Sequence, residues 1–155
     1  MQTHTPARTH AAARRQRGFT LIELMIGVAV TGILSSVALP SFEGQLQQSR
    51  RSDVLVATMT VQAAQERFRS NTSAYGTLDE IGVPALSTAK HYTLQVAAND
   101  AERFELLAIA TGLQARDVAC RFMKLSSNGM NLVYASGADA SVANAPAANQ
   151  KCWSL

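Results

Sequence analysis

The stretch RRQRGFTLIELMIGVAV, residues 14–30, decides how the rest of the chain is organised. A cluster of arginines precedes an apolar run, and one carboxylate, Glu23, lies near the start of that run. No charged side chain occurs from Leu24 to Phe42. That length is close to the roughly 20 apolar residues that an α-helix needs to cross a bilayer. The sequence therefore predicts a membrane-spanning helix with a carboxylate at its edge.

Outside this run the chain is short and close to neutral. The whole sequence has 155 residues and a formal net charge of +3. Four arginines and no acid occur in residues 1–18, so in a chain that begins at Phe19 the 14 basic and 11 acidic residues become 10 and 11. The positive charge thus belongs to the leader. A nearly neutral remainder argues against a nucleic-acid partner.

Three kinds of N-terminal signal compete for this segment. A secretory signal has an apolar region of about 7–15 residues and a small-residue cleavage site after it, whereas this run is longer and contains an acid. A twin-arginine export signal could begin at Arg14 and Arg15, but the same objections apply. A plain single-pass anchor explains the length and the basic flank. It does not explain Glu23.

The segment RGFTLIELMIGVAVTGILSSVALP resembles the N-terminus of type IV prepilins, with their class III methylated signal. The residues that carry the resemblance are Gly18 at the end of the leader, Phe19 at the start of the mature chain, Glu23 at its fifth position, and Pro40. The resemblance implies that a prepilin peptidase cuts between Gly18 and Phe19 and methylates the new amine. Unlike an ordinary signal, this one keeps its apolar helix.

The same resemblance implies a role for Glu23. A charged side chain within a membrane span is costly unless it is paired, and it is usually functional. In the family the proposed partner is the cationic amine of Phe19 on a neighbouring subunit, so Glu23 would set the stagger of stacked subunits. The alternative is a carboxylate that snorkels at the membrane surface. The implied partners are the prepilin peptidase, other pilin subunits and an inner-membrane assembly platform.

The helix is expected to continue beyond the membrane span. Apolar residues recur there at spacings of three and four, which is the pattern of an amphipathic helix. We expect one helix over residues 20–70, with an apolar segment at 19–45 and an amphipathic segment at 46–72. Pro40 lacks an N–H group and is expected to break or kink it. The expected core positions are Leu46, Val54, Ala57, Val61, Ala64 and Phe68, and the polar positions on other faces are Gln47, Arg50, Asp53, Gln62 and Arg67.

The expected head, residues 73–155, has the pattern of an antiparallel sheet. Glycine and proline punctuate residues 71–90, which predicts a loop with at most a short helical turn. A long helix followed by such a sheet is an α+β arrangement, and it matches the pilin fold that the resemblance implies. The four strands predicted from alternating apolar residues are 91–97, 102–111, 119–125 and 130–135.

Two cysteines, Cys120 and Cys152, lie in the expected head. Neither CxxC spacing nor a His/Cys metal pattern accompanies them. A head exported to the oxidising periplasm favours a disulfide, which would bound the C-terminal region 120–152; two free thiols are the alternative. The stretch ASGADASVANAPAAN between them is rich in small residues and predicts an exposed loop.

Other chemistry is sparse. His91 is the only histidine after Phe19, and the sequence has no Ser/His/Asp pattern, phosphate-binding loop or metal cluster. We therefore expect neither an enzyme nor a cofactor. Separate solvated side chains are favoured over a basic patch with Phe68 and Phe122 for four basic residues, namely Arg67, Arg69, Arg121 and Lys124.

The sequence thus leads to a structural subunit of a type IV pilus. A minor pilin is favoured because AAQERFRSNTSAYGTLDEIG and the late KCW resemble the small PilE-like minor pilins. Such a subunit is first held in the inner membrane by a single pass, with its head in the periplasm, and then enters an extracellular pilus. Two alternatives stay open: a type II secretion pseudopilin and a competence pilin that binds DNA.

Overall fold

The computed structural model describes the backbone of residues 18–129 and 131–154. Their side chains are described too, apart from those at 39–41 and 97–99. The first 17 residues of the expected leader lie outside the described part of the chain.

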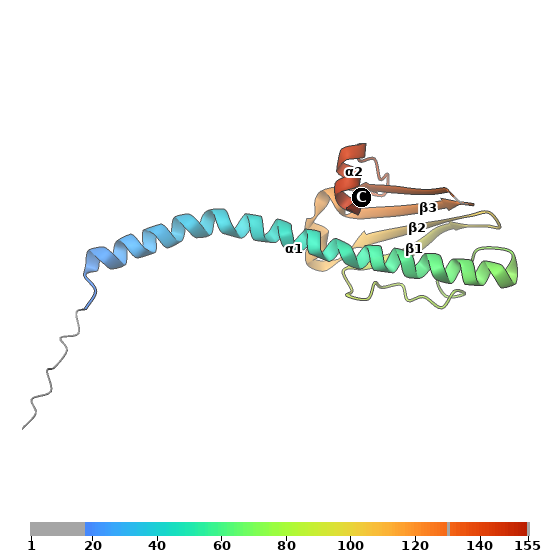
Figure 1. The fold of residues 1–155 in the computed structure, drawn as a ribbon, viewed down its shortest axis with the longest axis horizontal. Coiled ribbons are helices and arrows are strands. Elements are labelled where there is room, and N and C mark those ends of the chain that lie inside the picture. Colours follow the sequence, from blue (N-terminus) through green and yellow to red (C-terminus); the bar gives the residue numbers. More distant parts are fainter. Residues whose placement is uncertain (1–17, 130, 155) are drawn as a thin grey trace, which may run out of the picture. The chain divides into compact units, whose positions relative to one another are not determined.

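The chain divides into two compact units, Met1–Pro40 and Ser41–Leu155, and each is considered by itself. One long helix, α1 (Leu21–Thr72), begins in the first unit and ends in the second (Figure 1). From here on, the head means the second unit, which includes the second part of α1 and all of the strands that the structure describes.

Local hydrogen bonds define both ends of α1. Thr20 is the residue before the first helical position, and its side chain caps the helix. At the other end Ser73 adopts a positive φ of 60°, and its N–H donates to the carbonyl of Arg69 at 2.9 Å. A residue in the left-handed conformation is a common way to end a helix. The continuous helix expected over residues 20–70 is confirmed.

The head contains a four-stranded antiparallel sheet in which strands that follow each other in sequence are neighbours, in the order β1-β2-β3-β4. The alternation of apolar residues that predicted these strands is therefore confirmed, and with it the α+β fold class. The strands are β1 (Tyr92–Asn99), β2 (Arg103–Ala110), β3 (Phe122–Asn128) and β4 (Asn131–Gly137).

Three short helices complete the head. Two of them are 3₁₀ helices between β2 and β3, namely η1 (Gly112–Arg116) and η2 (Val118–Cys120). The third, α2 (Pro146–Trp153), follows β4. The third strand was predicted to begin at residue 119 and instead begins at Phe122, because η2 occupies the residues before it.

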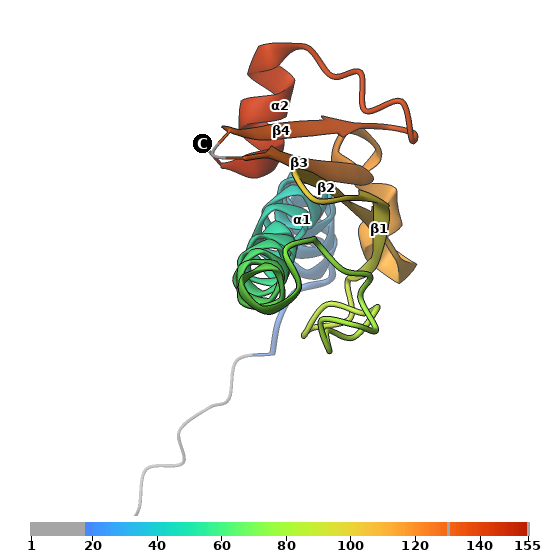
Figure 2. The same cartoon turned by 90° about the vertical axis from the view of Figure 1, so that its right-hand side faces the viewer.

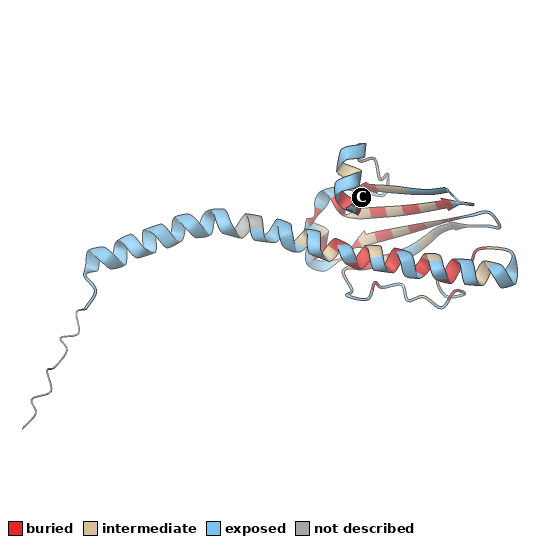
Figure 3. Cartoon of the chain, in the orientation of Figure 1, coloured by how far each residue is buried: buried red, intermediate tan, exposed pale blue. Residues whose placement is uncertain are grey.

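The part of α1 within the head packs on one face of the sheet (Figures 2 and 3). Burial alternates along β2 and β3, so that one face of each strand is covered. Four of the six expected core positions on α1 are buried, and Phe68 is partly buried against them. Leu46 is 38% exposed, so its placement in the core was wrong. The principal buried side chains are Val54, Ala57, Val61, Ala64, Tyr92, Leu94, Phe104, Leu106, Met123 and Leu125.

Hydrogen bonds from buried polar side chains also connect α1 to the loop between α1 and β1. The Nε2 of Gln65 donates to the carbonyl of Gly76 at 2.7 Å, and its Oε1 accepts from the N–H of Gly76 at 2.9 Å. Asp53 accepts from the Ser87 hydroxyl at 2.5 Å and from the N–H of His91 at 3.2 Å. The expectation that Asp53 lies away from the packed face was wrong. Donors from the loop that precedes β1 take the place of water around its carboxylate.

The C-terminal segment covers the edge strand β4. The Nδ2 of Asn149 donates to the carbonyl of Tyr134 at 2.7 Å, and the Nε1 of Trp153 donates to that of Ala135 at 3.0 Å. Both donors belong to α2, which lies beside β4 in Figure 2. Edge strands present unpaired backbone groups, and a covering helix prevents another strand from pairing there.

The disulfide expected between Cys120 and Cys152 is present, with 5.5 Å between the Cα atoms. It joins η2 to α2. The small-residue stretch, residues 135–149, was expected to form an exposed loop; its first three residues instead end β4, and its last part belongs to α2, which begins with Pro146. Proline is favoured in the first turn of a helix because its missing N–H has no partner there in any case.

Removal of the disulfide by Cys152→Ser should lower the free energy of unfolding by about 3 kcal/mol, because the bond restricts the unfolded chain. We expect the full chain in detergent to melt several degrees lower and to reach a lower steady-state level in cells. Wild-type protein treated with a reductant should melt at the temperature of the variant. Equal melting temperatures for the oxidised wild type and the variant would contradict a stabilising role.

Candidate functional site

The N-terminal segment, residues 18–38, is exposed at every position in the structure. Phe19 is 89% exposed and Val37 is 72% exposed. By length and composition α1 could cross a membrane. Covering apolar surface is favourable by about 25 cal/mol per Å². A segment with so much exposed apolar surface is therefore suited to lipid or to the apolar surfaces of other chains.

Glu23 forms a reciprocal capping box with Thr20. The Oε2 of Glu23 accepts from the N–H of Thr20 at 3.0 Å and from its hydroxyl at 2.9 Å. The Thr20 hydroxyl in turn accepts from the N–H of Glu23 at 3.3 Å. Such a pair satisfies N–H groups that have no partner within the helix. Thr20 was not predicted as a site residue, although its T-x-x-E spacing is the signal of a capping box.

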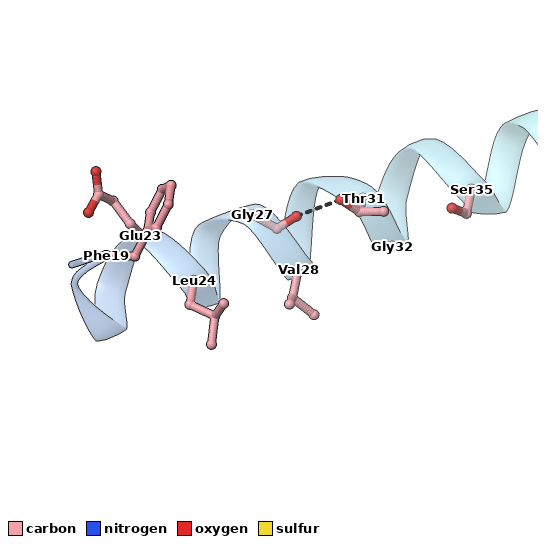
Figure 4. A pocket seen from close by; sticks show the side chains of 8 residues that line it. All are labelled: Phe19, Glu23, Leu24, Gly27, Val28, Thr31, Gly32 and Ser35. Carbon is pink, nitrogen blue, oxygen red and sulfur yellow. Dashed lines mark hydrogen bonds between the residues drawn. The ribbon is translucent and has the colours of Figure 1, made fainter. Parts of the chain in front are cut away.

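The second carboxylate oxygen of Glu23 has a different environment. Within the described part of the chain, no hydrogen bond to Oε1 accompanies those to Oε2. Figure 4 shows the carboxylate pointing away from the helix axis. One oxygen therefore caps α1, and the other is free to accept from a donor outside this chain.

An apolar hollow runs along one flank of α1, with Phe19 and Glu23 at one end (Figure 4). The hydroxyl of Thr31 donates to the carbonyl of Gly27 at 2.7 Å, so the polar group is satisfied within the helix. Small residues on a helix in lipid allow another helix to approach closely. The hollow thus offers a contact surface for a helix next to Glu23. Its other lining residues are Leu24, Val28, Gly32 and Ser35.

Gly18 and Pro40 are the other predicted positions in this segment. A Cβ atom built at Gly18 meets no atom within 4 Å, so the isolated chain has room for a larger side chain there. Packing within the described chain therefore does not require glycine at this position. The backbone stays helical through Pro40. The side chain at that position is outside the described set, and the helix break stays a prediction.

The head holds a buried polar cluster where α1 meets η1 and η2. The Nε of Arg51 donates to Oδ2 of Asp117 at 2.7 Å, and its Nη2 donates to Oδ1 at 3.0 Å. Gln114 donates to the same carboxylate and to the hydroxyl of Tyr92, both at 3.1 Å. Burial raises the pKa of Tyr92 to about 12, which keeps the phenol protonated. These buried groups hold helices together and are not open to a substrate.

The residues considered for a basic patch lie apart. The Nη1 of Arg69 donates to the hydroxyl of Tyr75 at 2.9 Å, close to the end of α1. The Nε of Arg121 donates to the carbonyl of Ala115 in η1 at 3.0 Å. The two arginines thus have different partners on different elements, which agrees with the preference against a single patch. No group of three or more His, Cys, Asp or Glu side chains that could hold a metal ion is found among the described residues.

Comparison with known proteins matches both parts of the chain. Residues 13–39 match the prokaryotic N-terminal methylation motif. Residues 40–124 match the family described as "Type IV minor pilin ComP, DNA uptake sequence receptor". The first match contains Gly18, Phe19 and Glu23, and the second contains most of the head. They confirm the resemblance to type IV prepilins.

Individual relatives match over shorter regions. The chain is 39% identical to "Type IV major pilin protein PilA" of Myxococcus xanthus over 90 residues, 57% of this chain and 41% of that protein. It is 32% identical to "Type II secretion system core protein G" of Klebsiella pneumoniae over 76 residues, 49% of this chain and 54% of that protein. The chain thus spans about half the length of these curated relatives. Because the ComP model matches more than half of the chain, the chain belongs to the type IV minor pilin ComP family.

Proposed function

We propose that the chain is a minor pilin, a structural subunit without enzyme activity that is assembled into a type IV pilus through its N-terminal helix. The observation that carries this proposal is an exposed apolar segment, residues 19–38, which precedes a separately packed head on the same helix. The head needs no cover of this size, because its own core is closed by α1 and the sheet. The segment is what lipid or other subunits would cover.

Processing would separate a leader, residues 1–18, from the mature chain. A prepilin peptidase would cut after Gly18 and methylate the amine of Phe19, and the match to the methylation motif supports both steps. Before assembly, residues 19–45 would hold the chain in the inner membrane as a single pass. The amphipathic segment 46–72 and the region 73–155 would then lie in the periplasm, where the disulfide forms.

Assembly would transfer the apolar segment from lipid to the core of a filament, with the help of an inner-membrane platform. We assign Glu23 a second partner there, the Phe19 amine of a neighbouring subunit. The unoccupied Oε1 and the hollow beside it support this assignment. Pro40, at the border of the two units, is where we expect the helix to open when a subunit leaves the bilayer.

The location of the mature protein tests this proposal. Cells expressing the chain should yield, in sheared pili, a form that begins with N-methylated Phe19, detected by mass spectrometry. A minor subunit should be present there at a small fraction of the major pilin. The protein should be absent from sheared material of a strain that lacks the prepilin peptidase. Recovery only in a secretion-system fraction would favour the pseudopilin alternative, which the matches to core protein G support.

DNA binding is a second candidate function. The family that matches residues 40–124 is described as a DNA uptake sequence receptor. The neutral composition argues against this function, and the family match argues for it. Measuring binding of short duplexes to the full chain in detergent at several salt concentrations decides between them. A receptor should bind more weakly as salt rises and should prefer one sequence over its scrambled version.

A further inference from the structure

The end of the head where α1 enters it brings several segments together. The Nε2 of Gln114 in η1 donates to the carbonyl of Gln47 at 3.3 Å. Arg51 lies one turn later on α1. Its Nε is 2.7 Å from Oδ2 of Asp117, and its Nη1 donates to the carbonyl of Lys151 at 3.1 Å. The first turns of α1 in the head, η1, η2 and the C-terminal half of α2 therefore meet here. We call this surface the entry end of the head.

Charge is unevenly distributed along the head. Arg51 and Asp117 at the entry end are buried and neutralise each other. Among the described residues, the remaining charged side chains there are five cations and three acids, whereas the opposite end has three cations and five acids. At the entry end they are Arg50, Lys90, Arg116, Arg121 and Lys151 with Glu43, Asp53 and Asp139, and Asp53 accepts from the N–H groups of Ala89 and His91 on either side of Lys90. At the opposite end they are Arg67, Arg69 and Arg103 with Glu66, Asp79, Glu80, Asp100 and Glu102.

Apolar side chains are exposed among these cations. Leu113 in η1 is 57% exposed and Val118 in η2 is 52% exposed. A pocket lies between α1 and η1, and its charged lining residues are Arg50, Arg116 and one acid, Glu43. Leu113 lines this pocket together with Arg50 and Arg116, so η1 presents an aliphatic side chain beside guanidinium groups. This combination suits a surface that is both anionic and partly apolar.

The entry end is also close, along the chain, to the end of the apolar segment. Phe42 is the last residue of the uncharged run, and Glu43 follows it. From Glu43 to Arg50 the helix rises about 10 Å at 1.5 Å per residue. The polar layer on each side of a bilayer is roughly 5–8 Å thick, and a long arginine side chain can reach back toward it. When the apolar segment spans a membrane, Arg50 and η1 are within reach of the phospholipid headgroups.

We propose that the entry end of the head docks on the anionic phospholipid headgroups of the leaflet from which α1 emerges. This inference rests on the proposed membrane anchoring of the unassembled subunit. Guanidinium groups of Arg50 and Arg116 bind lipid phosphates, because arginine offers paired donors that match phosphate oxygens. Leu113 and Val118 enter the boundary between headgroups and acyl chains. Docking holds the head against the membrane before the subunit is assembled.

Lipid explains this surface better than nucleic acid does. Duplex DNA would use the cations, since phosphate contacts dominate its binding. Apolar contacts to DNA go to thymine methyl groups or between base steps, whereas exposed leucine and valine among cations match the boundary of headgroups and acyl chains directly. The short distance along the chain from the expected membrane span also favours lipid.

Hydrogen exchange of the full chain in lipid nanodiscs tests the proposal. Amides of residues 112–121 should exchange more slowly in discs containing phosphatidylglycerol than in discs of phosphatidylcholine alone, and high salt should remove the difference. Each basic residue near an anionic surface contributes about 1 kcal/mol, so Arg116→Gln should weaken docking about fivefold. Leu113→Ser should reduce protection without changing the salt dependence.

Arg67→Gln is the matched control, because Arg67 is an exposed α1 arginine at the opposite end of the head. It should leave the protection unchanged. Co-purification of the chain with the discs measures anchoring separately, so loss of anchoring would count against the proposed function and not against docking alone. Equal exchange in both lipids, or protection of residues 112–121 by a short DNA duplex and not by phosphatidylglycerol, would overturn the proposal.

Discussion

A chain carrying Gly18→Val is expected to accumulate at the length of the precursor and to be absent from sheared pili. The position has room for the side chain, since no atom lies within 4 Å of a Cβ built there. The fold of the head and the insertion of the apolar segment should therefore be unchanged. Loss of cleavage would then reflect recognition by the peptidase. N-terminal sequencing of the membrane protein measures it directly, and the expected effect is a nearly complete loss.

Gly27→Val provides the matched control for this result. Gly27 is another glycine of the N-terminal segment whose Cβ position is open. The same substitution there should leave cleavage after Gly18 intact. Normal processing of Gly18→Val, or a wild-type N-terminus located after Pro40, would contradict prepilin processing and point to ordinary secretion.

The parts of the fold that follow from periodic burial were predictable from the sequence. Apolar residues at spacings of three and four gave α1, because one helical face must cover a sheet. Alternation gave the strands, since every second residue faces that helix. The errors lie where a short polar sequence is ordered by distant contacts. Helix α2 has only eight residues, too few for a repeating apolar pattern, and the disulfide and bonds to the backbone of β4 hold it in place.

The buried polar contacts of α1 were not predictable for a related reason. Asp53 and Gln65 look like solvent-facing helix residues in the sequence. They are buried because loop donors and acceptors that are far away in sequence satisfy them, as Ser87 and Gly76 do. An unsatisfied buried polar group would be costly, so these contacts depend on the complete tertiary structure. Local pattern alone does not contain that information.

At the candidate site the sequence pointed to Glu23 through an expected role in assembly, and it did not point to the capping role that the structure shows. The resemblance implied pairing with a neighbouring subunit. The capping box with Thr20 is a local role that the structure adds. The two roles use different oxygens, so neither excludes the other. Separating them requires variants that remove one role at a time.

Glu23→Val should insert into the membrane at least as well as the wild type, because it removes a charge that costs about 3 kcal/mol in a span. Cleavage after Gly18 should continue. Incorporation into pili should nevertheless fall strongly, since the Phe19 amine of the neighbour would lose its carboxylate. Membrane fractionation, N-terminal sequencing and immunodetection in sheared pili measure these three steps separately.

Two further variants decide which role of Glu23 matters for assembly. Glu23→Gln keeps a side chain that can complete the capping box and removes only the charge. Thr20→Val removes the cap, at a cost of about 1 kcal/mol, and keeps the carboxylate. Charge pairing predicts that Glu23→Gln fails to enter pili as Glu23→Val does, while Thr20→Val enters them nearly as well as the wild type. The opposite pattern would make Glu23 a helix cap. Normal incorporation of all three would show that the carboxylate is dispensable, as for a subunit at a filament tip with no neighbour above it.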